Sequence, residues 1–167
     1  MRSLVSEKDL VEILNLRHEN PNLMGWAPRT RRGFNYFTPD EYYEAWLNNL
    51  VTVNCTWLDV GCGRNIFPGN PNLARVLAKR CGLLVGVDPD LRIEENTLVH
   101  RRVVGRIEDS EGDCQFDVVT LRMVAEHIGE PDQAVSFSLH LGSRAVFLAN
   151  CRSPGAPLSG ELPTGGL

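Results

Sequence analysis

The chain has 167 residues, of which 43% are hydrophobic and 23% are charged, as expected for one globular domain with a sizeable core. Its formal net charge of −4 offers no general attraction to nucleic acid. Five scattered cysteines without a C-x-x-C pair speak against a disulfide framework or a metal site and favour the reducing cytoplasm. No segment approaches the roughly 20 apolar residues that a membrane span needs, so neither nucleic acid nor a membrane is an expected partner.

Residues 6–19 are predicted to form the first helix. Ser6 can cap its first turn, and Asp9 stands three residues further on as the partner of a capping box. Leucine and isoleucine recur at helical spacing on one face, which indicates packing against a core. Residues 21–33 contain prolines and glycines that break this pattern, and no regular element is predicted there.

The second predicted helix begins after Thr38. The side chain of Thr38 can cap the first turn, and Glu41 closes the capping box at the third helical position. Apolar and aromatic side chains recur along one face of this helix, which is typical of packing. Contact of Tyr42 or Tyr43 with a substrate is the alternative. Residues 1–50 are therefore expected to form an N-terminal helical segment.

Residues 56–90, TWLDVGCGRNIFPGNPNLARVLAKRCGLLVGVDPD, predict a βαβ unit. Its first strand ends near Asp59, and a turn containing Gly61 and Gly63 leads into a helix. A second apolar strand ends at Asp88. The glycines let the backbone approach a ligand where any Cβ would clash. Asp88, at the carboxyl end of its strand, is placed to accept hydrogen bonds from ribose hydroxyls.

The residues around the glycine turn distinguish two kinds of nucleotide site. The G-x-G-x-x-G fingerprint of a dinucleotide site needs glycine at its sixth position, which is Ile66 here when counted from Gly61. Asp59, two residues before the first glycine, suits a cationic ligand better than a pyrophosphate. The pattern therefore argues against a nicotinamide dinucleotide oxidoreductase.

Three segments together resemble the class I S-adenosylmethionine-dependent methyltransferases that act on small molecules: DVGCG at 59–63, VGVDP at 85–89 and FDVVTL at 116–121. The resemblance covers about residues 37–132. It implies an α/β fold, a Rossmann-like three-layer sandwich with a mainly parallel sheet of order 3-2-1-4-5. It also implies S-adenosylmethionine as cofactor and methyl transfer to a small-molecule acceptor. For the N-terminal helices it implies either packing on the core or a lid over the ligand.

The resemblance also assigns site residues, with one departure in the adenine site. Arg106 stands where the family often has an acid that meets the adenine amino group. Glu108, backbone groups near Ile107, or stacking with Ile107 as an apolar wall would then recognise the adenine. Ile107 as plain core is the alternative. His127 is the candidate general base, with a structural role as the alternative. The expected cofactor-binding residues are Asp59, Gly61, Cys62, Gly63, Asp88, Pro89, Ile107, Glu108, Leu121 and Arg122.

Three more strands and a helix are predicted in the second half of the chain. The strands cover residues 98–104, 116–121 and 144–149, and the helix begins at residue 131 and ends near residue 141. The two arginines in the third strand mark it as an edge candidate. Arg122 follows the fourth strand, which places it either near the reacting centre or on the surface as a plain cation.

The C-terminal segment departs from the family pattern. Members usually continue past the fifth strand with a helix and an antiparallel hairpin, and no such pattern follows here. Residues 151–167 are rich in Pro, Gly and Ser and are predicted to be a disordered tail, which leaves residues 51–150 as the cofactor-binding domain. The chain is then a naturally short methyltransferase, or a truncated or frame-shifted one. A catalytically inactive cofactor-binding remnant is the alternative function, and the edge of the fifth strand is a route to oligomers.

Overall fold

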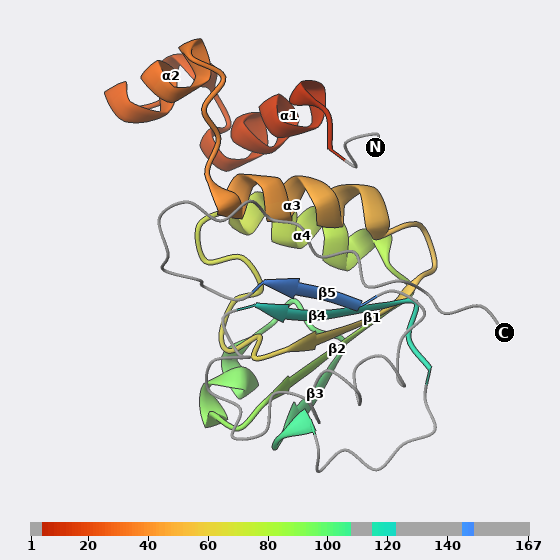
Figure 1. Cartoon of the computed structure of the whole chain (residues 1–167). Helices are drawn as coiled ribbons and strands as arrows, with labels where there is room; N and C mark the ends of the chain where they lie inside the picture. Colours follow the sequence, from red (N-terminus) through yellow and green to blue (C-terminus); the bar gives the residue numbers. More distant parts are fainter. Residues whose placement is uncertain (1–4, 108–114, 123–144, 149–167) are drawn as a thin grey trace, which may run out of the picture.

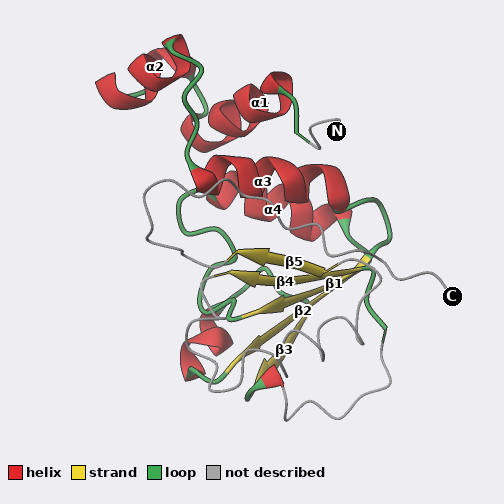
Figure 2. Cartoon of the chain, in the orientation of Figure 1, coloured by secondary structure: helices red, strands yellow, loops and turns green. Residues whose placement is uncertain are grey.

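The computed structural model describes residues 5–107, 115–122 and 145–148, and Figure 1 and Figure 2 show their arrangement. Five parallel strands form one sheet of order β3-β2-β1-β4-β5, which confirms the predicted α/β fold and strand order. The predicted absence of a C-terminal hairpin falls outside the described residues. The strands are β1 (Thr56–Val60), β2 (Leu83–Asp88), β3 (Arg101–Val104), β4 (Val118–Arg122) and β5 (Ala145–Leu148).

The central strands are buried on both faces, as expected for parallel strands. Side chains alternate between the faces. Trp57 belongs to the larger core cluster, which also contains residues from the helices that cover the sheet. Leu58 and Val60 point to the opposite face, where they pack with Leu121 and Ile107. Asp59, two residues after Trp57, therefore points to the helix-covered face.

Helices α3 (Pro39–Leu50) and α4 (Pro71–Arg80) cover that face, as Figure 1 shows. The predicted capping box of α3 is present, with Thr38 and Glu41 bonded reciprocally. The side chain of Asn70 caps α4 by accepting a hydrogen bond from a backbone N–H of the first turn. Val76 of α4 is 38% exposed. The buried side chains of this helix are Leu73, Ala74, Leu77 and Ala78.

Helix α1 (Glu7–His18) lies on the outer side of α3 and α4, away from the sheet (Figure 1). Ser6 and Asp9 form the predicted capping box. The side chain of Arg17 pairs with the buried Glu44 of α3 at 2.7 Å. A 3₁₀ turn, η1 (Pro21–Leu23), follows α1.

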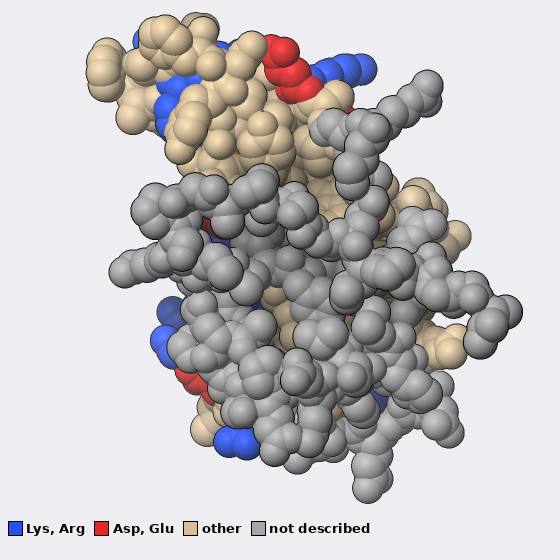
Figure 3. All heavy atoms as spheres, in the orientation of Figure 1, with Lys and Arg blue, Asp and Glu red and all other residues tan. Residues whose placement is uncertain are grey.

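Helix α2 (Trp26–Gly33) corrects the prediction that residues 21–33 carry no regular element. It buries none of its side chains, so it has no apolar stripe from which a helix could be predicted. Polar contacts hold it instead: the guanidinium of Arg29 donates to the carbonyl oxygen of Met24 at 2.7 Å, and Arg31 pairs with Glu41 of α3 at 3.0 Å. In Figure 3 basic side chains lie over α2 among mostly uncharged atoms.

A second 3₁₀ element, η2 (Leu91–Glu95), follows β2 and packs against β2 and β3. Across the described ranges, no helix is long and apolar enough to cross a bilayer. Outside these ranges lie the predicted helix at 131–141, the predicted tail at 151–167, and the candidate site residues Glu108 and His127.

Candidate functional site

The loop between β1 and α4 turns through two glycines with left-handed backbone. Gly61 has φ 72° and Gly63 has φ 47°, a region that costs other residues about 1–2 kcal/mol. The backbone N–H of Gly61 donates to the carbonyl oxygen of Val87 at 2.7 Å, which ties the loop to β2. The sequence places glycine where this conformation requires it, and the loop lies at the carboxyl ends of β1 and β2.

Asp88, the last residue of β2, binds this loop through its carboxylate. Its Oδ2 accepts a hydrogen bond from the backbone N–H of Gly63 at 2.8 Å, and its Oδ1 accepts one from the N–H of Asp90 at 2.8 Å. A carboxylate has about four acceptor positions, so each oxygen keeps capacity for a further donor. Pro89, which stands between Asp88 and Asp90 in the chain, is exposed. The structure thus places a preorganised acceptor pair beside the glycine loop.

Asp59 lies inside the sheet on its helix-covered face and is only 4% exposed. Its Oδ1 accepts a short hydrogen bond, 2.6 Å, from the hydroxyl of Thr120 on the neighbouring strand β4. The same Thr120 oxygen accepts the indole N–H of Trp57 at 2.8 Å. Burial raises the pKa of Asp59 from its ordinary 3.8 to about 7, although Thr120 and the Arg122 guanidinium act to lower it.

Tyr43 of α3 lies over Asp59 and Thr120 on the helix-covered face of the sheet. Its side chain is 2% exposed and packs edge-to-face on Phe67. Burial, and then the neighbouring Asp59 carboxyl, raise the pKa of the phenol well above its usual range, while a hydrogen bond with Thr120 opposes this. Tyr43 is therefore part of the core beneath α3, whereas Tyr42 is 42% exposed.

Cys62 contributes to the loop through its backbone, because its side chain turns into the core. It is 4% exposed, and a Cβ on Gly86 of β2 would lie 2.5 Å from its sulfur. Burial raises the pKa of the thiol, with further contributions from Asp59 and Asp88. The thiol is thus protonated at neutral pH and packs as a small apolar group.

Ile107 and Leu121 are both buried on the opposite face of the sheet, in one apolar cluster with Val85 and Val87. A wall for an adenine ring and a plain core position both remain compatible with this placement. Arg122, the last residue of β4, pairs with Asp40 at the first turn of α3, with 3.3 Å between Nη2 and Oδ1. Arg122 therefore lies at the same end of the sheet as the glycine loop.

Asn96 was missed by the sequence analysis although it supports the loop directly. It is completely buried, and its side-chain amide donates to the carbonyl oxygen of Gly63 at 3.0 Å. Its Oδ1 accepts the backbone N–H of Leu98 at 3.1 Å. Asn96 stands in an irregular segment without a motif, so only its tertiary contacts reveal its role. The same holds for Thr120, which reads in the sequence as one more β-branched strand residue.

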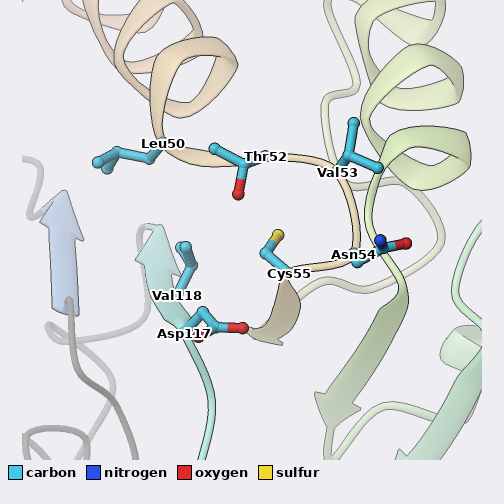
Figure 4. A pocket seen from close by; sticks show the side chains of 7 residues that line it. All are labelled: Leu50, Thr52, Val53, Asn54, Cys55, Asp117 and Val118. Atoms are coloured by element: carbon cyan, nitrogen blue, oxygen red, sulfur yellow. The ribbon is translucent and has the colours of Figure 1, made fainter.

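A hollow lies at the opposite end of the strands from the glycine loop. It has a volume of about 280 Å³ and opens at the amino ends of β1 and β4, as Figure 4 shows. The carboxylate of Asp117 in its wall already accepts hydrogen bonds from the N–H and the hydroxyl of Thr56 at 2.7 and 2.9 Å. This hollow is therefore separate from the group of acids and glycines described above. Its lining residues are Leu50, Thr52, Val53, Asn54, Cys55, Asp117 and Val118.

No family model and no curated protein matches the chain significantly. Solved structures do match. The N-methyltransferase NodS from Bradyrhizobium japonicum in complex with S-adenosylhomocysteine is similar over 83% of this chain and 71% of its own, at 15% identity and a TM-score of 0.50. The phosphoethanolamine N-methyltransferase 1 of Haemonchus contortus, with phosphoethanolamine and S-adenosylhomocysteine, is similar over 71% of this chain and 26% of its own, at 19% identity and a TM-score of 0.50.

These matches decide the fold. It is the Rossmann-like fold of the class I S-adenosylmethionine-dependent methyltransferases. A TehB-like methyltransferase from Corynebacterium glutamicum matches over 72% of this chain and 67% of its own, at 19% identity and a TM-score of 0.49. The fold that the motifs predicted is confirmed by the two matches with a TM-score of 0.50.

Proposed function

We propose that the chain binds S-adenosylmethionine at the carboxyl ends of β1 and β2 and transfers its methyl group to a small-molecule acceptor. One observation carries the proposal. The loop of Gly61 and Gly63 follows Asp59, next to last in β1, and is hydrogen-bonded to Asp88, the last residue of the adjacent parallel strand β2. In open α/β sheets ligands bind at this end, outside the strands. Residues 51–150 are the proposed cofactor-binding unit.

The described residues fit the two ends of this cofactor. Asp88 keeps free acceptor positions beside the glycine loop, as ribose hydroxyls require. Asp59 is a buried acid with one hydrogen bond from a described residue and a pKa of about 7. An ammonium group beside it would favour the charged carboxylate and lower this pKa. Asp59 is therefore suited to hold the methionine end.

The chemistry asks little of the protein. When bound, S-adenosylmethionine supplies an activated methyl group and its own leaving group. In this proposal the chain's residues hold and orient the cofactor. Asp59 holds the ammonium group and Asp88 holds the ribose, while the glycine loop lets the backbone approach the cofactor closely. Leu121 and Arg122 are the proposed floor at the end of β4. This explains why the sequence contains no nucleophile paired with a base. His127 as general base is a proposal about a residue outside the described ranges.

Calorimetric titration of S-adenosylmethionine and S-adenosylhomocysteine tests the binding proposal. Wild type is expected to bind both compounds with micromolar affinity. Asp88→Ala is expected to bind them at least tenfold more weakly. Asp9→Asn, an acid exchanged at the exposed start of α1, is the control and should bind like wild type. Tighter binding of a nicotinamide dinucleotide, or no binding of either methionine compound to folded wild type, would contradict the proposal.

The alternative, a cofactor-binding remnant without catalysis, needs a second assay. Release of S-adenosylhomocysteine is followed in the presence of a panel of small amines, phenols and carboxylates. Turnover with any acceptor supports the transferase. Tight binding without turnover on every acceptor supports the remnant, and the two assays together separate a failed cofactor site from a failed acceptor site.

A further inference from the structure

Arg122 carries a guanidinium whose charge the described residues balance incompletely. Its side chain is 22% exposed, and Nη2 forms an ion pair with Asp40 at 3.3 Å. Asp40 is itself 49% exposed. The Nε of Arg122 is shielded from solvent and has no hydrogen-bond partner among the residues that the structure describes. A buried donor left without an acceptor is costly, so the geometry leaves an anion position next to Nε.

The edge of the Arg122 guanidinium that carries Nε and Nη2 has the donor geometry that binds a carboxylate. The Nε–H and one Nη2–H of a guanidinium point in parallel and bind both oxygens of a carboxylate at once. Asp40 uses only the Nη2 side of this edge. A ligand carboxylate that replaced Asp40 would engage both donors, which is a better arrangement than the present single contact.

The position of Arg122 relates it to the cofactor site. Val60 pairs with Leu121 in the sheet register, so Arg122 comes level with Gly61 at the start of the glycine loop. Asp59 lies close enough for the guanidinium to influence its carboxyl group. The site thus places the carboxyl group of Asp59 near the guanidinium of Arg122. An α-amino acid carries the two complementary groups, an ammonium for Asp59 and a carboxylate for Arg122.

We propose that Arg122 binds the carboxylate of the cofactor's amino-acid end, in exchange for Asp40, while Asp59 holds its ammonium. This inference rests on the proposed function and goes beyond it by assigning the second charge of the ligand. Arg122 is then a cofactor-binding residue, and Asp40 a competing partner that covers the guanidinium in the free protein.

The test compares S-adenosylmethionine with decarboxylated S-adenosylmethionine, which keeps the ammonium and lacks the carboxylate. Wild type should bind the carboxylated form at least tenfold tighter. Arg122→Gln should lose this preference and keep its affinity for the decarboxylated form. Arg122→Lys should recover part of the preference, because an ammonium supplies charge without the paired donors. Arg64→Gln removes an exposed charge next to the glycine loop and should keep the preference.

Asp40→Asn gives a test in the opposite direction. Removing the competing carboxylate should tighten binding of S-adenosylmethionine several-fold and leave the decarboxylated form unchanged. If wild type shows no preference, or if Arg122→Gln keeps it, the assignment is wrong even though the cofactor binds. If neither form binds to folded wild type, the proposed function itself fails. Thermal unfolding of each variant shows that the comparison is made on folded protein.

Discussion

Replacing Asp59 by Asn is expected to stabilise the protein at alkaline pH and to abolish cofactor binding. Asp59 is buried, and its pKa lies at about 7 instead of 3.8. Below about pH 4 Asp59 is protonated in both the native and the unfolded chain, so its ionisation has no effect on stability. Between about pH 4 and 7 the unfolded chain loses this proton and the native chain keeps it, so stability falls as pH rises.

The size of the effect follows from the two pKa values of Asp59. Their difference of about three pH units corresponds to about 4 kcal/mol at pH 8 and to about 1–2 kcal/mol at pH 5. Asn can keep the hydrogen bond from Thr120 but adds amide N–H groups, whose lack of acceptors costs about 1–3 kcal/mol. A net gain on the order of 1–3 kcal/mol at pH 8 is expected. The gain should shrink by about 2–3 kcal/mol between pH 8 and pH 5, whatever the amide costs.

Urea unfolding of wild type and Asp59→Asn at pH 5 and pH 8 measures both quantities. Among the described residues, the titratable and charged groups that face Asp59 are Tyr43 from α3, Arg122 from β4, Asp88 from β2 and Cys62 from the glycine loop. The substitution leaves all four in place. An equal difference in unfolding free energy between the two proteins at both pH values would refute the reasoning, because Asp59 would then titrate like an exposed acid.

Asp9→Asn is the matched control for Asp59→Asn. The N–H and hydroxyl of Ser6 donate to this exposed carboxylate and lower its pKa. The charged form of Asp9 is thus the one that the native state favours, so its contribution is present above about pH 4 and is lost as pH falls. Asp9→Asn should therefore lose a little stability at pH 8, the opposite sign to Asp59→Asn, and bind the cofactor normally.

Three further predictions concern the glycine loop and the strands beside it. Cofactor binding near pH 7 should release a proton, because the ligand's ammonium favours the charged form of Asp59; calorimetry in buffers of different ionisation enthalpy measures this. Gly63→Ala should cost about 1–2 kcal/mol and weaken binding, whereas Gly69→Ala, where a Cβ meets nothing closer than 3.9 Å, should change neither. Gly86→Ala should cost about 1–3 kcal/mol in urea unfolding because its Cβ meets the sulfur of Cys62, and a second substitution, Cys62→Ala, should restore part of the loss. Unaltered binding in Gly63→Ala, or no rescue by Cys62→Ala, would contradict these contacts.

Local signals predicted much of the fold. Ser6 and Thr38 each start a helix with a capping box, and Asn70 starts a third, because caps depend on residues only three positions apart. Continuous apolar runs likewise located the buried strands. Helix α2 could not be found in this way, since its helical state depends on Arg31 reaching Glu41 and on other polar contacts and not on an apolar stripe.

The chemistry of the site was harder to predict than its position. The motif around Asp59 indicated an acid at the carboxyl end of a strand, but its high pKa arises from burial beneath α3, which no motif expresses. Asn96 reaches Gly63 across 33 residues, and Thr120 reaches Asp59 across 61. Such distant contacts exist only after the strands have found their register, so sequence spacing gives no sign of them.

Helix α3 connects the site with the N-terminal helices, and a capping box and several ion pairs together fix its rotation. Thr38 and Glu41 fix the first turn. This turn presents Asp40 to Arg122 at the end of β4, and the next turn places Tyr43 over Asp59. The outer side of the helix turns Glu41 and Glu44 toward arginines of α1 and α2. A slip of one residue would rotate all of these side chains by about 100°. The charged contacts of α1 and α2 with buried carboxylates therefore hold α3 in the one register that serves the candidate site.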